Sequence, residues 1–372
     1  MESKSFKYVQ PGKVMLNVDE IISFLDVDGN LIDKKNDTTL TKEELLKAYK
    51  FMVLSRQQDT YMTQLQRQGR MLTFAPNFGE EALQVASAMT LEKEDWYVPA
   101  FRSNATMLYM GVPVKQQLLY WNGNERGSKI PEGINLLPVN IPIATQCSHA
   151  AGIAYSMKLR KIPGVAVSII GNGGTAEGEF YEAMNISAIW KWPAVFCVNN
   201  NQWSISTPEK LESSSSTIAA KAYSVGIPGI RVDGNDLLAS YAVMKEAMEY
   251  ARQGNGPVLV EFITWRQGPH TTSDNPKVYR TEEQEKAAEV WEPMHRIEKY
   301  LKDKKYITTE EIQKVWDDSL AEVKVAFEES QKELEVDINE VFDYTYAQLT
   351  PELAEQKAEA LAYYQKLAKG GK

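Results

Sequence analysis

Residues 171–204, GNGGTAEGEFYEAMNISAIWKWPAVFCVNNNQWS, place two polar, turn-forming patches on either side of a helical pattern and a short apolar run. The first patch, GNGG, follows the apolar run GVAVSII, and the second, NNNQ, follows the apolar run PAVFCV. Continuous apolar runs of this length are typical of parallel strands buried on both faces. The segment between the patches, from about Glu177 to Trp190, predicts a helix. The stretch therefore predicts a strand–helix–strand unit of a parallel sheet.

The alternation of strand and helix extends beyond this unit in both directions. Downstream, GIPGIRVDGND and PVLVEFITW predict two further strands, and LLASYAVMKEAMEYARQ predicts the helix between them. Upstream, a capping box from Thr41 to Glu44 begins a long helical pattern. GEEALQVASAMTL predicts a second helix, and a third begins near Ser148. We therefore expect an α/β fold with a mainly parallel sheet flanked by helices.

The two ends of the chain differ from this central pattern. In the N-terminal segment, Asp28 and Gly29 separate two alternating apolar runs, which predicts a hairpin turn. After about Thr281 the pattern becomes helical and charged, with a second capping box from Thr308 to Glu311. These changes divide the chain into an N-terminal arm (1–40), an α/β domain (41–280) and a helical C-terminal region (281–372). The last region is expected to wrap onto the same body or onto a partner.

The composition excludes several classes of function. The net charge of −9 argues against nucleic acid or an anionic membrane surface as the main partner. No apolar run is long enough to span a bilayer, and the N-terminal MESKSFKYVQPGKVM lacks the apolar core of a signal peptide. With two cysteines in apolar contexts, a reducing cytoplasm is the expected location. Only three histidines are present, so any metal is expected to be a hard cation held by oxygen ligands.

The two patches have complementary chemistry. Glycines at the start of a helix allow backbone N–H groups to approach an anion, which makes GNGG a candidate phosphate-binding loop. It lacks the spacing of the dinucleotide fingerprint and the Gly-Lys-Ser/Thr of a P-loop. The amides of NNNQ are suitable ligands for Mg²⁺ or Ca²⁺, and Mg²⁺ is usually shared with phosphates. Either patch alone would be interpreted as an ordinary turn, but together they predict a cation and a diphosphate between two strand ends.

The arrangement resembles the thiamin-diphosphate motif, in which Gly-Asp-Gly is followed by a helix, a strand and Asn-Asn. From about residue 15 onwards the chain resembles, more specifically, the alpha subunit of the thiamin-dependent 2-oxo acid dehydrogenase decarboxylase component, in the bacterial pyruvate dehydrogenase branch. The matching segments are PEGINLLP, AAGIA, GGTAEGEFYEAMN, NNNQWSISTP, GIPGIRVDGND, GPHTTSDNP and WEPMHRIEKYL, in the family's order. The resemblance implies a thiamin-diphosphate-binding fold.

The resemblance also implies the roles of individual residues. It assigns Mg²⁺ to Asn172, Asn201 and the carbonyl of Trp203, where the SIST segment sets the choice of Asn201 among three consecutive asparagines. The implied contacts to thiamin diphosphate come from Phe101, Arg102, Ile143, Asn172, Gly173, Gly174, Asn201, Arg266 and His270. His270 is the implied catalytic residue. Two positions depart from the family: Asn172 replaces its metal-binding aspartate, and Phe101 stands where a tyrosine is common.

The amide at position 172 leaves two hypotheses open. The diphosphate brings roughly two to three negative charges near neutral pH, so Mg²⁺ is neutralised without a carboxylate. Because asparagine oxygens are ordinary ligands for hard cations, we expect Asn172 to coordinate with weaker affinity and intact geometry. The alternative is a subunit that has lost the cofactor and serves as a scaffold.

The resemblance implies oxidative decarboxylation of pyruvate and transfer of the acetyl group to a lipoyl group on the acyltransferase component. The family's activating glutamate lies on a separate beta subunit, so an α2β2 heterotetramer within a multienzyme complex is expected. Branched-chain 2-oxo acid or acetoin dehydrogenases are alternatives with the same machinery. A nicotinamide-dependent dehydrogenase is a further alternative, against which the missing dinucleotide fingerprint counts.

Overall fold

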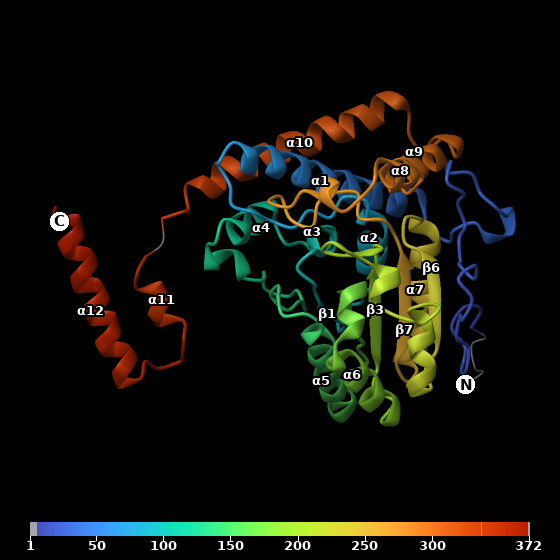
Figure 1. The fold of residues 1–372 in the computed structure, drawn as a ribbon, viewed down its shortest axis with the longest axis horizontal. Helices are drawn as coiled ribbons and strands as arrows, with labels where there is room; N and C mark the ends of the chain where they lie inside the picture. Colours follow the sequence, from blue (N-terminus) through green and yellow to red (C-terminus); the bar gives the residue numbers. More distant parts are fainter. Residues whose placement is uncertain (1–5, 336, 371–372) are drawn as a thin grey trace.

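The computed structural model, which describes residues 6–335 and 337–370, has a five-stranded parallel sheet in the order β1-β2-β3-β7-β6 (Figure 1). The strands are β1 (Trp96–Val98), β2 (Ala166–Gly171), β3 (Ala194–Asn200), β6 (Gly229–Asp233) and β7 (Val258–Ile263). A short antiparallel ribbon joins β4 (Trp203–Ser204) to β5 (Thr207–Pro208). The predicted α/β class and the mainly parallel sheet are confirmed.

Helices cover both faces of the sheet. One face carries α5 (Thr145–Arg160) and α6 (Gly178–Ile189), and the other carries α2 (Glu81–Met89) and α7 (Leu237–Arg252). The residues of β3 alternate between the two layers: Phe196 and Val198 share a hydrophobic cluster with α5 and α6, whereas Val195 and Cys197 share one with α2 and α7. Because both faces are covered, β3 is buried along its whole length, which explains its continuous apolar sequence.

The long helices begin where the capping boxes predict. In α1 (Lys42–Arg67), the Glu44 backbone N–H donates to Thr41 Oγ1 over 3.2 Å, and the Glu44 carboxylate accepts from the Thr41 N–H over 2.8 Å. Thr308 and Glu311 repeat this pattern at the start of α10 (Thr309–Gln331). α10 runs beside α1 across the top of the molecule in Figure 1. This part of the C-terminal region therefore wraps onto the body of the same chain.

The N-terminal arm lies along the edge strand β6. The Met15 N–H donates to the Gly229 carbonyl over 2.8 Å, and the Ile22 N–H donates to the Arg231 carbonyl over 3.1 Å. The arm therefore covers a sheet edge that would otherwise expose unpaired backbone groups. The predicted turn forms at Gly29, whose φ is +83° and whose Cβ, if present, would lie 2.6 Å from a backbone oxygen. Glycine is required there on both counts.

The remaining elements are short or lie outside the central layers. The other α-helices are α3 (Asn104–Met110), α4 (Val114–Trp121), α8 (Glu282–Ala287), α9 (Pro293–Asp303), α11 (Glu340–Asp343) and α12 (Pro351–Ala368). The 3₁₀ turns are η1 (Lys34–Asn36), η2 (Glu125–Ser128), η3 (Asn172–Ala176), η4 (Glu209–Leu211), η5 (Ala219–Val225), η6 (Pro276–Val278) and η7 (Ala288–Val290). α12 stands away from the body and has no buried residue among those described (Figure 1). Within the described ranges, every helix is too short or too polar to cross a bilayer.

Candidate active site

A cavity of about 540 Å³ lies at the carboxyl ends of β1, β2, β3 and β7. Parallel strands end at the same edge, so side chains distant in the sequence meet there. Every residue that the sequence predicts for the site lines this cavity: Phe101, Arg102, Ile143, Asn172, Gly173, Gly174, Asn201, Trp203, Arg266 and His270. The structure therefore brings the candidate residues together into one site.

The glycine loop after β2 packs too closely against its surroundings for side chains. A Cβ at Gly173 would lie 2.1 Å from Ser204 Oγ, and one at Gly174 would lie 3.1 Å from Ile170 Cδ1. The loop continues through η3 to α6, and Glu177, which caps α6, also lines the cavity. The start of a long helix therefore lies beside the cavity, which suits an anionic ligand.

Asn172 has one half of its amide satisfied and the other half unpaired. Its Nδ2 donates to Glu212 Oε2 over 2.7 Å and to Ser204 Oγ over 3.3 Å. Its Oδ1 is buried and has no hydrogen-bond partner among the described residues. An unpaired buried carbonyl oxygen is costly unless a ligand pairs with it. Its position in the cavity wall fits a cation ligand.

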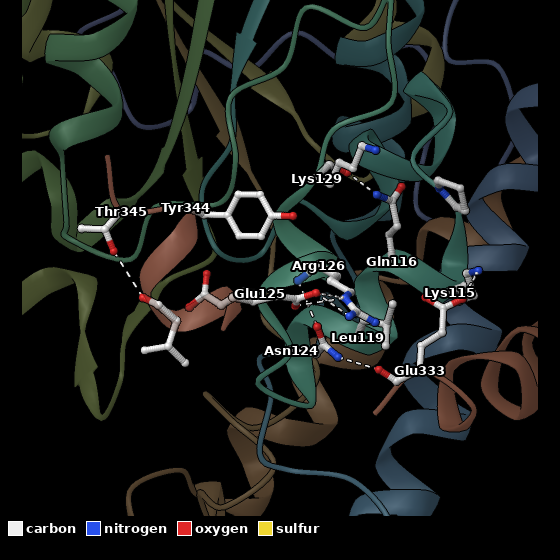
Figure 2. A pocket seen from close by; sticks show the side chains of 13 residues that line it. Lys115, Gln116, Leu119, Asn124, Glu125, Arg126, Lys129, Glu333, Tyr344 and Thr345 are labelled. Atoms are coloured by element: carbon white, nitrogen blue, oxygen red, sulfur yellow. Dashed lines mark hydrogen bonds and ion pairs between the residues drawn. The ribbon is translucent and has the colours of Figure 1, made fainter. Parts of the chain in front are cut away.

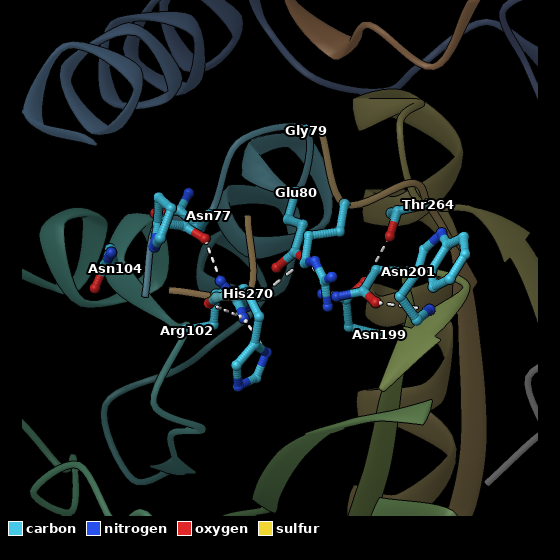
Figure 3. A network of polar contacts seen from close by, with 12 residues as sticks. Asn77, Gly79, Glu80, Arg102, Asn104, Asn199, Asn201, Thr264 and His270 are labelled. Carbon is cyan, nitrogen blue, oxygen red and sulfur yellow. Dashed lines mark hydrogen bonds and ion pairs between the residues drawn. The ribbon is translucent and has the colours of Figure 1, made fainter. Parts of the chain in front are cut away.

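The asparagines at the end of β3 face different neighbours. Asn201 Nδ2 donates to Glu80 Oε1 over 2.7 Å, and Asn201 Oδ1 accepts from the Trp203 backbone N–H over 3.3 Å (Figure 3). Asn200 Nδ2 instead donates to the buried Glu261 Oε1 over 2.8 Å. Asn201 therefore lines the cavity, whereas Asn200 is used in the packing of the sheet. Asn199 also lines the cavity, and its Oδ1 accepts from Thr264 Oγ1 over 2.7 Å, so the cavity lining excludes Asn200 but leaves Asn201 as a prediction.

Arg102 is held against the loop that follows β7. Its Nη2 donates to the His270 carbonyl over 2.9 Å and lies 3.3 Å from His270 Nδ1. Its Nε lies 4.0 Å from Glu80 Oε1 at the start of α2 (Figure 3). Burial lowers the pKa of Arg102, although the Glu80 carboxylate opposes this shift. The guanidinium, which also donates through Nη1 to the Pro76 carbonyl, thus sits in the cavity wall with its position set by Pro76, His270 and Glu80.

Arg266 carries a second buried positive charge. Its Nη2 donates to the Ile205 carbonyl over 2.7 Å and to Tyr279 Oη over 2.9 Å. Its Nε has no hydrogen-bond partner within the described part of the chain. Burial and the nearby positive charges of Arg102 and Arg280 lower the pKa of Arg266 to about 10. Because the arginines repel one another, an anion bound between them would be stabilised.

His270 is a neutral base in this environment. Burial, reinforced by the charges of Arg102 and Arg266, lowers the pKa of His270 to about 4. Its backbone N–H donates to Asp274 Oδ2 over 2.8 Å, which anchors the loop. Its ring makes an edge-to-face contact with Phe101, with centroids 6.0 Å apart. At neutral pH the imidazole can therefore accept a hydrogen bond or a proton.

Two acidic residues at the site were not predicted. Glu80 is completely buried, and burial raises its pKa, while Arg102 and the hydrogen bond from Asn201 oppose the rise. Glu212 pairs with Asn172, as described above. Neither residue has a local signal in the sequence, because GEEAL suggests only a helix and EKLESSSS only a solvated loop. Their roles depend on tertiary contacts.

A larger cavity, of about 1080 Å³, lies between α4 and the segment that contains α11 (Figure 2). Its charged side chains mostly pair with one another: Lys115 with Glu333 over 2.8 Å, and Arg126 with Glu340 over 2.5 Å. Paired charges of this kind stabilise the packing of the C-terminal segment and leave little unpaired charge for a ligand. We therefore assign the candidate site to the cavity at the strand ends.

The donor set at the strand ends fits a hard cation. Within the described ranges, the acidic, histidine and cysteine side chains form no cluster of three that could hold a metal. The available donors are the Asn172 and Asn201 amide oxygens and backbone carbonyl groups. Oxygen donors of this type suit Mg²⁺ rather than a transition metal. Together with the buried arginines and the glycine loop, they fit a metal–diphosphate group.

Known proteins match this chain over most of its length. The family model described as "Dehydrogenase E1 component" matches residues 49–339. A "Pyruvate dehydrogenase E1 component subunit alpha" from Mycoplasma pneumoniae is 54% identical over 339 residues, which cover 91% of this chain and 95% of the relative. Relatives with the same name from Acholeplasma laidlawii and Staphylococcus aureus are 47% and 37% identical; both cover 91% of this chain, with 99% and 91% of the relatives covered.

Proposed function

The chain belongs to the dehydrogenase E1 component family, and we infer from this premise that it is the alpha subunit of a pyruvate dehydrogenase E1 component. As such it is an enzyme subunit that takes part in the oxidative decarboxylation of pyruvate. The acetyl group then passes to a lipoyl group on the acyltransferase component and on to acetyl-CoA. The level of identity, 54% over nearly the whole chain, supports pyruvate over branched-chain 2-oxo acids or acetoin as the substrate.

The family depends on thiamin diphosphate, and we propose that this chain binds it with Mg²⁺. Mg²⁺ is held by Asn172, Asn201 and the Trp203 carbonyl. The diphosphate is held by Gly173, Gly174, Arg102, Arg266 and His270, while Ile143 and Phe101 contact the rest of the cofactor. The proposal rests above all on the unpaired, buried Oδ1 of Asn172. This atom favours metal coordination over the hypothesis of a cofactor-free scaffold.

Each side chain contributes to catalysis by position and charge. Thiamin diphosphate supplies the electron sink that allows a 2-oxo acid to lose carbon dioxide. Arg102 and Arg266 offset the charge of the diphosphate in a site from which burial excludes much of the water. His270, neutral before the anion binds, accepts a hydrogen bond or a proton at the imidazole.

We propose a cytoplasmic α2β2 assembly in which the beta subunit completes the site. Three isoleucines around the cavity expose about half of their surface: Ile141 (51%), Ile143 (48%) and Ile205 (57%). Exposed apolar side chains at the mouth of a cavity favour coverage by another protein chain. The beta subunit fits this place, since the relatives are named as the alpha subunit of the E1 component.

The first test is binding of Mg²⁺ and thiamin diphosphate to the purified complex of this chain with its beta subunit. Calorimetric titration is expected to show that each ligand requires the other for tight binding. Asn172→Ala and Asn201→Ala are expected to lower the Mg²⁺ affinity at least about tenfold, because each removes an oxygen ligand. The exposed Asn17→Ala is the matched control and should bind like the wild type.

The second half of this test concerns the substrate. Lipoyl acetylation is measured with pyruvate, a branched-chain 2-oxo acid and acetoin in parallel, and pyruvate is expected to be preferred. If the wild-type complex bound neither Mg²⁺ nor thiamin diphosphate, the proposed function would be wrong.

A further inference from the structure

Both asparagines proposed as Mg²⁺ ligands donate their amide N–H groups to a carboxylate. Asn172 Nδ2 donates to Glu212 Oε2, and Asn201 Nδ2 donates to Glu80 Oε1, each over 2.7 Å. An ionised carboxylate only accepts hydrogen bonds, so each contact determines which end of the amide faces it. The carbonyl oxygens are therefore turned away from the carboxylates.

We propose that Glu212 is a positioning residue that orients Asn172 and supplies the negative charge that the amide itself lacks. This inference rests on the proposed function, since it concerns the same Mg²⁺ site. In the resembled family, an aspartate combines the oxygen ligand and the negative charge in one side chain. Here the two properties are divided between Asn172, which presents the oxygen, and Glu212, which carries the charge behind it.

The charge on Glu212 is available to the site. The Glu212 Oε1 is buried without a hydrogen-bond partner among the described residues, and the charged group that interacts with it nearby is another carboxylate, Glu209, which does not neutralise it. The backbone N–H of Glu212 donates to the Glu209 carbonyl over 2.9 Å, which anchors the residue at the end of η4. An unneutralised carboxylate directly behind a ligand amide favours a cation on the far side of that amide.

Glu80 has a similar contact but a different electrostatic role. It lies 4.0 Å from Arg102 Nε, so the guanidinium offsets part of its charge. Its hydrogen bond fixes Asn201 in the same way that Glu212 fixes Asn172. The charge that compensates for the amide at position 172 is therefore assigned to Glu212.

In this arrangement the residue types at positions 172 and 212 depend on each other, because one must carry an amide and the other a carboxylate. An aspartate at position 172 could not donate to Glu212, and two carboxylates in direct contact would repel one another. Exchanging the groups, with aspartate at 172 and glutamine at 212, preserves both the net charge and the hydrogen bond. In the exchanged pair the amide introduced at position 212 would donate to the carboxylate introduced at position 172.

The inference is tested by Mg²⁺ titration of the complex with its beta subunit at saturating thiamin diphosphate, with Mn²⁺ binding by electron paramagnetic resonance as a second readout. Glu212→Gln, which keeps an acceptor oxygen but removes the charge, is expected to lower the metal affinity roughly 10- to 100-fold. Glu212→Ala removes the acceptor as well, and its loss should be at least as large. The double variant Asn172→Asp/Glu212→Gln is expected to return to within about threefold of the wild type, since the two sites are coupled.

Glu182→Gln is the control for the loss of one carboxylate charge, because Glu182 is exposed on α6 and is not one of the residues proposed for the site. Its metal affinity should stay close to that of the wild type, and unfolding without metal should show that all variants fold. If the wild type bound the metal and Glu212→Gln bound it equally well, the inference would be wrong while the proposed function stood. The inference would also be wrong if the double variant bound no better than Glu212→Gln. Absence of binding by the wild type would overturn both.

Discussion

At the residue scale, two residues of the cavity wall carry buried atoms without a hydrogen-bond partner in the described part of the chain, one an acceptor and the other a donor. Asn172 Oδ1 is a buried acceptor and Arg266 Nε a buried donor, and neither has a partner among the described residues. Each unpaired buried group costs about 1–3 kcal/mol of stability. A cation satisfies the first and an anion the second, so a metal–diphosphate group removes both costs at once. The two unpaired atoms therefore lower the stability of the folded chain by itself and favour binding of the proposed ligand.

The protonation of His270 gives a prediction that does not depend on turnover. Its pKa of about 4 lies below the value of about 6.5 for an unperturbed histidine. The unfolded chain thus binds a proton at a higher pH than the folded chain does. His270 contributes stability above about pH 6.5, and this contribution is lost as the pH falls towards 4. Urea unfolding between these pH values should show a weaker acid dependence for His270→Gln than for the wild type.

The same residue should respond to an anion. Magnesium and pyrophosphate would offset the charges of Arg102 and Arg266, so the pKa of His270 is expected to rise when they bind. Nuclear magnetic resonance titration follows this shift, with the His270 signal assigned by its absence in His270→Gln. An unchanged pKa in the presence of bound pyrophosphate would place the anion away from the arginines.

At the element scale, the sequence predicts the helices and strands that have a pattern of their own in the sequence. It does not predict a short strand that forms only by hydrogen bonding to a neighbouring strand. The apolar runs of β2, β3 and β7 were identified because strands covered on both faces need continuous apolar residues. β1 was missed, since its three residues are too few for a periodic pattern and only pairing with β2 makes them a strand. Even so, Arg102 follows β1 and was placed in the site by resemblance. Glu80 and Glu212 could not be found in this way, because their contacts join distant segments.

The glycine loop after β2 allows a test at the same scale. Gly173→Ala would place a methyl group 2.1 Å from Ser204 Oγ, so the loop or β4 must shift. A loss of about 1–3 kcal/mol in the free energy of unfolding is expected, with weaker thiamin diphosphate binding. Gly178→Ala is the control, since the added Cβ at the start of α6 meets no atom within 4 Å. Thermal unfolding should show no loss of stability for Gly178→Ala. Equal losses of stability for both variants would contradict the idea that close packing around Gly173 excludes a side chain.

At the scale of the whole molecule, the chain forms a cavity whose wall combines buried arginine and asparagine side chains with many apolar residues, including isoleucines that remain half exposed. α9 and α10 fold back over the body, whereas no described residue of α12 is buried (Figure 1). Among the described residues that line the cavity, Glu177 is the only carboxylate, and it is exposed. The composition argues against nucleic acid and anionic membranes as main partners, but it contains no signal for a particular protein partner. The half-exposed isoleucines at the proposed site come together only once the strand ends meet in the fold.

The proposed role of the beta subunit predicts that the chain alone does not decarboxylate pyruvate. The family resemblance implies that a carboxylate activates the ring end of the cofactor, and the proposed beta subunit is expected to supply it. Purified chain with Mg²⁺, thiamin diphosphate and pyruvate should therefore release no carbon dioxide above background, and addition of the beta subunit should restore release. The variant Glu177→Gln tests whether Glu177 of this chain supplies the carboxylate instead. If the beta subunit supplies it, the complex of the beta subunit with Glu177→Gln should retain activity. Carbon dioxide release by the chain alone that Glu177→Gln abolishes would show instead that Glu177 fills this role and that the cavity is complete without a partner.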